Sequence, residues 1–96
     1  MKTFKDLHFK DHELKGYIAR YSKGICKQAR LQFENGYSVS VLIGDLFYSN
    51  GLDTYELAVL DYKGDIYYGL NLKNDDVFGY ITEDEVTKYM IEVQKL

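Results

Sequence analysis

Two runs of alternating apolar and polar residues, separated by an Asn-Gly pair, constrain the fold of this chain more than any other feature. The apolar members recur at every second position: Ala29, Leu31 and Phe33, then Tyr37, Val39, Val41 and Ile43. A period of two is typical of half-buried strands. A three-residue loop, Glu34-Asn35-Gly36, places Phe33 opposite Tyr37 and brings the apolar faces together, whereas a two-residue Asn-Gly turn mixes core with solvent positions. The sequence therefore predicts a hairpin over 28–43, with Gly36 at positive φ in a bulged turn.

Alternation continues further along the chain. Residues 55–60 predict another strand, and 66–70 a partner strand beyond a turn over 61–65. A two-residue or a four-residue loop gives one register, which pairs Leu57 with Leu70 and Val59 with Tyr68 and leaves Tyr67 on the opposite face. Near the N-terminus, 4–9 fits either a short strand or one helical turn, and 13–22 fits a helix.

The C-terminal segment has the pattern of an amphipathic helix. Thr82 and Glu85 form a capping-box sequence. Apolar residues follow at helical spacing: Val86, Tyr89, Met90 and Val93. The expected fold is one α+β domain over 1–96, an antiparallel sheet of four or five strands in meander order with this helix packed on one face.

Charge and composition exclude several classes of protein. The chain has 96 residues and a net charge of −3, which argues against a general nucleic-acid binder. Residues 1–44 carry a net +4 and residues 45–96 a net −7. No apolar run reaches the roughly 20 residues of a membrane span, and no signal peptide is evident. A single cysteine fits an intracellular chain, so we expect a cytoplasmic protein without membrane association.

Few residues form a pattern that indicates catalysis or metal binding. His8 and His12 are four apart, and Asp11 lies beside them. This spacing fits either a weak metal site or, the favoured interpretation, a solvated segment. Cys26 has no motif of a nucleophile around it and is interpreted as a buried thiol. No phosphate loop or nucleophile motif occurs, so we expect neither catalysis nor a cofactor.

Aromatic and acidic residues are the candidates for partner binding. Ten tyrosines are more than the predicted core needs, which fits either partner binding or rings that are buried with the hydroxyl left in water. Residues 44–54 form an unusually long connection. The candidate contact residues are Phe47, Tyr48, Asp75, Asp76, Tyr80, Glu83 and Asp84. The carboxylates either form a solvated helix start or an acidic surface that docks on a basic site.

Four segments resemble small proteins encoded by phages and prophages: 3–7, 33–41, 55–60 and, most strongly, 75–86, with the sequence Asp-Asp-Val-Phe-Gly-Tyr-Ile-Thr-Glu-Asp-Glu-Val. Residues 13–27 and 44–54 depart from that family. The family is mostly uncharacterised, so no catalytic residue is carried over. The resemblance implies a non-enzymatic inhibitor of host defence, similar to anti-CRISPR proteins, that binds and occludes a host protein.

Two alternatives stay open. One is an oligomer, for instance a homodimer, that sequesters a nucleotide signal with the basic cluster Arg20, Lys23, Lys27 and Arg30. The other is a virion or assembly component.

Overall fold

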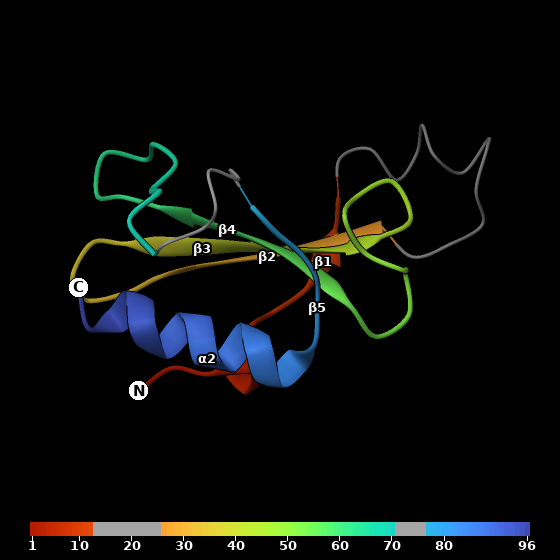
Figure 1. The fold of residues 1–96 in the computed structure, drawn as a ribbon, viewed down its shortest axis with the longest axis horizontal. Coiled ribbons are helices and arrows are strands. Elements are labelled where there is room, and N and C mark those ends of the chain that lie inside the picture. The colour runs from red at the N-terminus through yellow and green to blue at the C-terminus, as the bar shows by residue number, and fades with distance from the viewer. Residues whose placement is uncertain (13–25, 71–76) are drawn as a thin grey trace.

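A computed structural model describes residues 1–12, 26–70 and 77–96. Within these ranges the chain forms a five-stranded antiparallel sheet in the order β1-β2-β3-β4-β5 with a C-terminal helix (Figure 1). The elements are a 3-10 turn η1 (Phe4–Asp6), β1 (Lys10–Asp11), β2 (Cys26–Gln32), β3 (Ser38–Gly44), β4 (Tyr55–Leu60), β5 (Phe78–Ile81) and α2 (Glu83–Gln94). The predicted α+β meander is confirmed. The helix expected over 13–22 falls outside the described residues.

The β2–β3 hairpin has the predicted register. Leu31 pairs with Val39 and Ala29 with Val41. The turn closes with the amide of Phe33 donating to the Tyr37 carbonyl at 2.7 Å, and Gly36 has φ +88°. The three-residue bulged loop therefore forms because it alone keeps the apolar positions of both strands on one face.

The prediction of a strand over 66–70 is wrong. Residues 66–70 form no strand and pair with β4 only through an isolated bridge between Leu60 and Ile66. The amide of Tyr67 donates to the Val59 carbonyl at 2.8 Å. The turn is again a three-residue loop. The Asp61 carboxylate stabilises it by accepting hydrogen bonds from the amides of Lys63 and Asp65 at 2.8 and 3.0 Å. This register differs by one residue from the predicted one, so Tyr67 packs toward the core instead of away from it.

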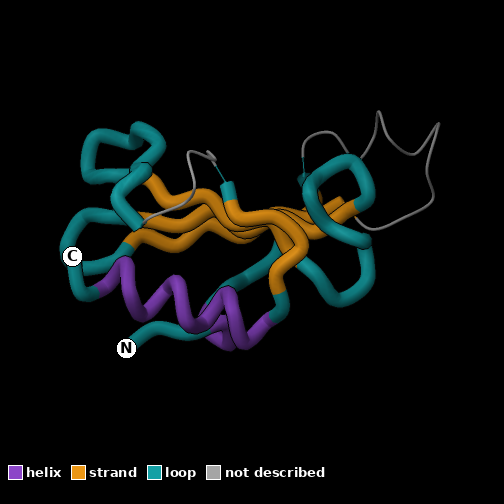
Figure 2. The backbone as a smooth tube through the Cα atoms, in the orientation of Figure 1, coloured by secondary structure: helices purple, strands orange, loops and turns teal. Residues whose placement is uncertain are grey.

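The core lies between the sheet and α2 (Figures 1 and 2). Residues that are fully buried come from two strands, β3 and β4, and from the helix: Val39, Val41, Leu57, Val59, Val86, Met90 and Val93. The predicted capping box is present, with the Glu85 amide donating to Thr82 Oγ1 at 3.3 Å and the Thr82 amide to Glu85 Oε1 at 3.1 Å. Tyr89 stacks on Phe78 with ring centroids 3.9 Å apart, which anchors β5 to the helix.

The N-terminal segment packs against the same core. The ring of Phe4 lies 5.1 Å from that of Tyr55, and the amide of Phe4 donates to Thr87 Oγ1 at 3.1 Å. Figure 1 shows this segment beside α2, with the 44–54 connection at one end of the sheet and the 61–70 segment at the other. In the described part of the chain, no helix has the length and apolar character needed to cross a membrane.

Candidate partner-binding surface

The 44–54 connection is held together by hydrogen bonds to Ser49. This side chain is buried. Its hydroxyl donates to the Thr54 carbonyl at 2.7 Å and accepts from the amides of Gly44 and Gly51 at 3.2 and 3.0 Å. One side chain thus ties together both ends and the middle of the connection.

Asn50 fixes the second half of the connection. Its Oδ1 accepts from three consecutive amides, those of Leu52, Asp53 and Thr54, at 2.9, 3.0 and 3.1 Å. Its Nδ2 donates to the Asp53 carboxylate at 2.7 Å. The Asn50 side chain thus accepts the hydrogen bonds that backbone carbonyls would accept in a strand or helix. This explains how a long loop keeps one conformation.

The connection packs directly on β5. The amide of Tyr80 donates to the Tyr48 carbonyl at 2.8 Å, and the two rings meet edge to face with centroids 6.3 Å apart. Gly79 makes this approach possible, because a Cβ at that position would lie 2.7 Å from the Tyr48 Cβ. Residues more than thirty positions apart in the sequence therefore form one surface.

Both tyrosines of this pair are exposed, and one has an unusual backbone. Tyr48 and Tyr80 each keep 59% of their surface accessible. Among the non-glycine residues that the structure describes, only Tyr80 has a positive φ, at +55°. The left-handed region is costly for a residue with a Cβ and is occupied mainly by Gly, Asn and Asp. Leu46 and Leu52, on the same connection, are exposed as well.

A carboxylate lies at the base of the pair. Glu56 Oε1 accepts from the Tyr48 amide at 3.3 Å. Tyr55 is a core residue. Its hydroxyl donates to the Glu83 side chain, and desolvation, followed by the charges of Glu83 and Asp53, raises the pKa of Tyr55. We call the exposed side chains of Leu46, Tyr48, Leu52 and Tyr80, together with the flanking carboxylates of Asp53, Glu56 and Glu83, the Tyr48–Tyr80 surface.

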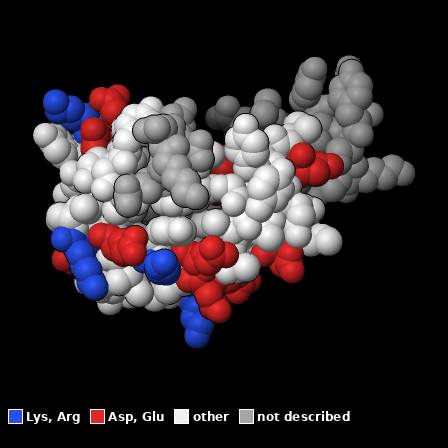
Figure 3. All heavy atoms as spheres, in the orientation of Figure 1, with Lys and Arg blue, Asp and Glu red and all other residues white. Residues whose placement is uncertain are grey.

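The start of α2 continues this surface with negative charge. Glu83, Asp84 and Glu85 occupy the first turn of the helix and are exposed. Figure 3 shows Asp and Glu side chains gathered over that part of the molecule. Part of this charge stabilises the helix start, where acidic side chains complement the helix dipole.

The structure brings some of the predicted contact residues together and not others. Tyr48 and Tyr80 contact each other at one end of the sheet. Glu83 follows Tyr80 by three residues and contacts Tyr55 instead, and Asp84 lies next to Glu83 on the helix. Phe47 points elsewhere: its half-buried ring lies 5.1 Å from that of His12. Asp75 and Asp76 fall outside the described residues, as do Arg20 and Lys23 of the proposed basic cluster.

Four members of the surface were missed by the sequence reasoning: Leu46, Leu52, Asp53 and Glu56. The sequence does hold one indication: Leu46 and Leu52 lie within a long connection that is rich in Gly, Asn, Asp and Ser. Neither leucine has a place in the strand or helix pattern, and this could have indicated that both are exposed.

The residues considered for metal binding or catalysis do not converge in the described ranges. Residues 1–12, 26–70 and 77–96 contain no group of three or more His, Cys, Asp or Glu side chains placed to hold a metal ion. Cys26 is buried, as expected for a thiol that packs as a small apolar side chain.

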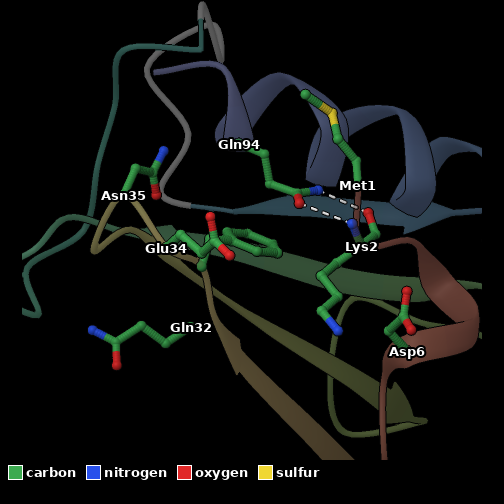
Figure 4. A pocket seen from close by; sticks show the side chains of 8 residues that line it. Met1, Lys2, Asp6, Gln32, Glu34, Asn35 and Gln94 are labelled. Carbon is green, nitrogen blue, oxygen red and sulfur yellow. Dashed lines mark hydrogen bonds between the residues drawn. The ribbon is translucent and has the colours of Figure 1, made fainter.

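A hollow of about 530 Å³ lies at the end of the sheet near the chain termini (Figure 4). Its wall includes Lys2, Asp6, Glu34 and Gln94. The Gln94 side chain accepts from the Lys2 amide at 2.8 Å and donates to the Lys2 carbonyl at 2.7 Å, as the dashed lines in Figure 4 show. Since the charges there have mixed sign and Gln94 is already engaged, we assign the hollow a structural role in holding the N-terminal segment.

Comparison of the sequence with protein-family models, with curated proteins and with solved structures gave no significant match.

Proposed function

We propose that this chain is a non-enzymatic binding protein that occludes a functional surface of another protein through its Tyr48–Tyr80 surface. The observation that carries the proposal is the pair of exposed tyrosines held at a fixed position on a hydrogen-bonded connection. Tyrosine is enriched among the residues that dominate the affinity of protein interfaces.

Rigidity of the connection favours binding. An interface side chain that is ordered before association loses less conformational entropy on binding. The hydrogen bonds of Ser49 and Asn50, and the backbone bond between Tyr80 and Tyr48, hold the pair in place in the unbound chain. The strained backbone of Tyr80 supports the same interpretation, because such strain is concentrated at functional positions.

The class of partner in this proposal comes from the resemblance to small phage-encoded proteins. It makes the partner a host protein, in particular a nucleic-acid-handling component of a defence system. An acidic, tyrosine-bearing surface fits this role, because carboxylates and aromatic rings occupy a basic groove as phosphates and bases do.

The test is capture of proteins from a host lysate on the immobilised chain, with identification by mass spectrometry. The Tyr48→Ala/Tyr80→Ala double variant is expected to lose the captured protein. The matched control is Tyr62→Ala/Tyr68→Ala, because these tyrosines are 68% and 54% exposed and lie on the 61–70 segment at the opposite end of the sheet (Figure 1). Capture that survives the first double variant and fails with the second would overturn the proposed surface.

A further inference from the structure

We infer that the Tyr48–Tyr80 surface recognises an arginine side chain of its protein partner. This inference rests on the proposed function and specifies the chemistry of the contact. Two features of the surface lead to it: the geometry of the ring pair and the negative charge of the segments that carry the rings.

The ring pair leaves aromatic faces open to a ligand. The two rings meet at an interplanar angle of 67° with centroids 6.3 Å apart. In an edge-to-face pair, one ring contributes only its edge, so its faces are not covered by its neighbour. With 59% of each residue accessible, a cation can approach within the ~6 Å of a ring centroid that a cation–π interaction requires.

The two segments that carry the rings have charge of one sign. Residues 44–62 and 77–87 contain no Lys or Arg. Glu56 accepts from the Tyr48 amide, Asp53 accepts from Asn50 on the same connection, and Glu83 follows Tyr80 by three residues. A purely apolar partner would remove water from these carboxylates without replacing it, which costs free energy. A phosphate backbone would be repelled. A cationic side chain satisfies both the rings and the carboxylates.

Arginine fits this combination better than lysine. Its planar guanidinium stacks on an aromatic ring while its N–H groups donate to a carboxylate, and it is less strongly hydrated than an ammonium group. Lysine offers the same charge as a compact, strongly hydrated point. The partner segment is therefore expected to present arginine next to apolar side chains that cover Leu46 and Leu52.

Two acetylated, amidated peptides of equal length and charge test the inference: (Gly-Arg-Gly-Leu)₃ and (Gly-Lys-Gly-Leu)₃. Each is titrated into isotope-labelled protein, and the chemical shifts of tyrosine rings and backbone amides are followed by NMR. The arginine peptide is expected to shift the resonances of Tyr48 and Tyr80 and to bind roughly fivefold more tightly than the lysine peptide.

The Tyr48→Leu/Tyr80→Leu variant keeps the apolar bulk and removes the rings, so the preference for arginine should disappear. The matched Tyr62→Leu/Tyr68→Leu variant should retain it, and the amide spectrum of each variant reports that it is folded. Equal affinities for the two peptides, a preference that persists in the Tyr48→Leu/Tyr80→Leu variant, or no shift at Tyr48 and Tyr80 would each overturn the inference. The proposed function is overturned by a different result, namely capture of the partner from a lysate that is unchanged when Tyr48 and Tyr80 are replaced.

Discussion

Tyr80 combines an unfavourable backbone conformation with a side chain that is largely exposed to solvent. Its φ of +55° costs about 1–2 kcal/mol relative to the ordinary regions, and its ring is too exposed to recover that cost by burial within the chain. The ring does gain the contact with Tyr48, but an edge-to-face pair on the surface contributes only about 0.5–1.5 kcal/mol. Tyrosine is therefore not the most stable residue for this position of β5.

We predict that Tyr80→Asn leaves the free energy of unfolding unchanged or raises it by up to about 1 kcal/mol, because Asn adopts the left-handed region more readily. Partner affinity should fall at least roughly tenfold, as for the loss of an interface anchor. Denaturant unfolding and partner binding are measured on the same samples. Tyr62→Asn serves as the control and should keep its affinity. A large loss of stability with intact binding would show that Tyr80 has only a structural role.

Tyr55 gives the stability of the fold a pH dependence. Burial and the charges of Glu83 and Asp53 raise its pKa above the ordinary value of 10.0. Between that value and the higher pKa in the fold, the folded protein holds a proton that the unfolded chain has released. The contribution of neutral Tyr55 to the free energy of unfolding is therefore complete below about pH 10. It is lost as the pH rises through the pKa that Tyr55 has in the folded state.

Glu83→Gln is expected to lower the pKa of Tyr55 toward its ordinary value, since one of the two charges that oppose the phenolate is removed. The gap between the folded and unfolded pKa values narrows, so stability should fall less steeply above pH 10. Titration of the Tyr55 ring carbon by NMR measures the pKa. An unchanged pKa in this variant would mean that Glu83 does not contact the hydroxyl.

At the scale of elements, the 44–54 connection depends on Ser49 more than on any apolar contact of its own. We predict that Ser49→Ala destabilises the chain by about 1–3 kcal/mol, because the buried amide of Gly44 loses its acceptor and the Thr54 carbonyl loses its donor. Hydrogen exchange should accelerate at Gly44 and Gly51, and partner binding should weaken. Unchanged exchange at both amides would contradict the role assigned to Ser49.

The β2–β3 hairpin depends in the same way on Gly36. A side chain at this position would adopt φ +88° and bring its Cβ to 3.2 Å from the Tyr62 Cβ. Gly36→Val should therefore cost about 1–3 kcal/mol of stability. Thermal unfolding measures the effect, and a melting temperature equal to that of the parent chain would refute the bulged turn.

The sequence predicted elements whose signals are local. Leu31, Val39 and the Asn35-Gly36 turn determine the register of one hairpin, and Thr82 and Glu85 determine the start of α2. The turn after β4 was predicted incorrectly because its register depends on two hydrogen bonds to the Asp61 carboxylate, which strand periodicity does not reveal.

The candidate surface was only half predictable for a related reason. Tyr48 and Tyr80 were identified as separate residues, but their contact depends on the close approach at Gly79 and on the pairing of Tyr55 with Ile81. Such long-range contacts leave no periodic signal. Phe47 illustrates the opposite error: a residue next to Tyr48 in the sequence turns toward His12 instead.

At the scale of the whole molecule, charge is distributed unevenly. The segment 45–96 carries a net −7, and part of it is the acidic start of α2 beside the Tyr48–Tyr80 surface. A field of this kind increases the rate of association with a basic partner more than it strengthens the final complex.

We predict that partner association slows as salt is raised from about 0.05 to 0.5 M, because exposed charges are screened. Replacing Asp84 with Asn should slow association in low salt without changing the fold, whereas Glu85→Gln keeps the capping interaction and should have a smaller effect. Surface plasmon resonance gives the rates, and circular dichroism checks the fold. Association that is insensitive to salt would mean that the carboxylates serve only the helix start.

The most direct measurement is photo-crosslinking from the two ends of the molecule. Benzoylphenylalanine is placed at position 80 in one sample and at position 62 in another, so that each aromatic probe replaces a tyrosine of comparable exposure. Occlusion through the Tyr48–Tyr80 surface predicts a covalent adduct with the partner from position 80 and none from position 62. An adduct from position 62 alone would place the interface at the opposite end and contradict the proposed surface.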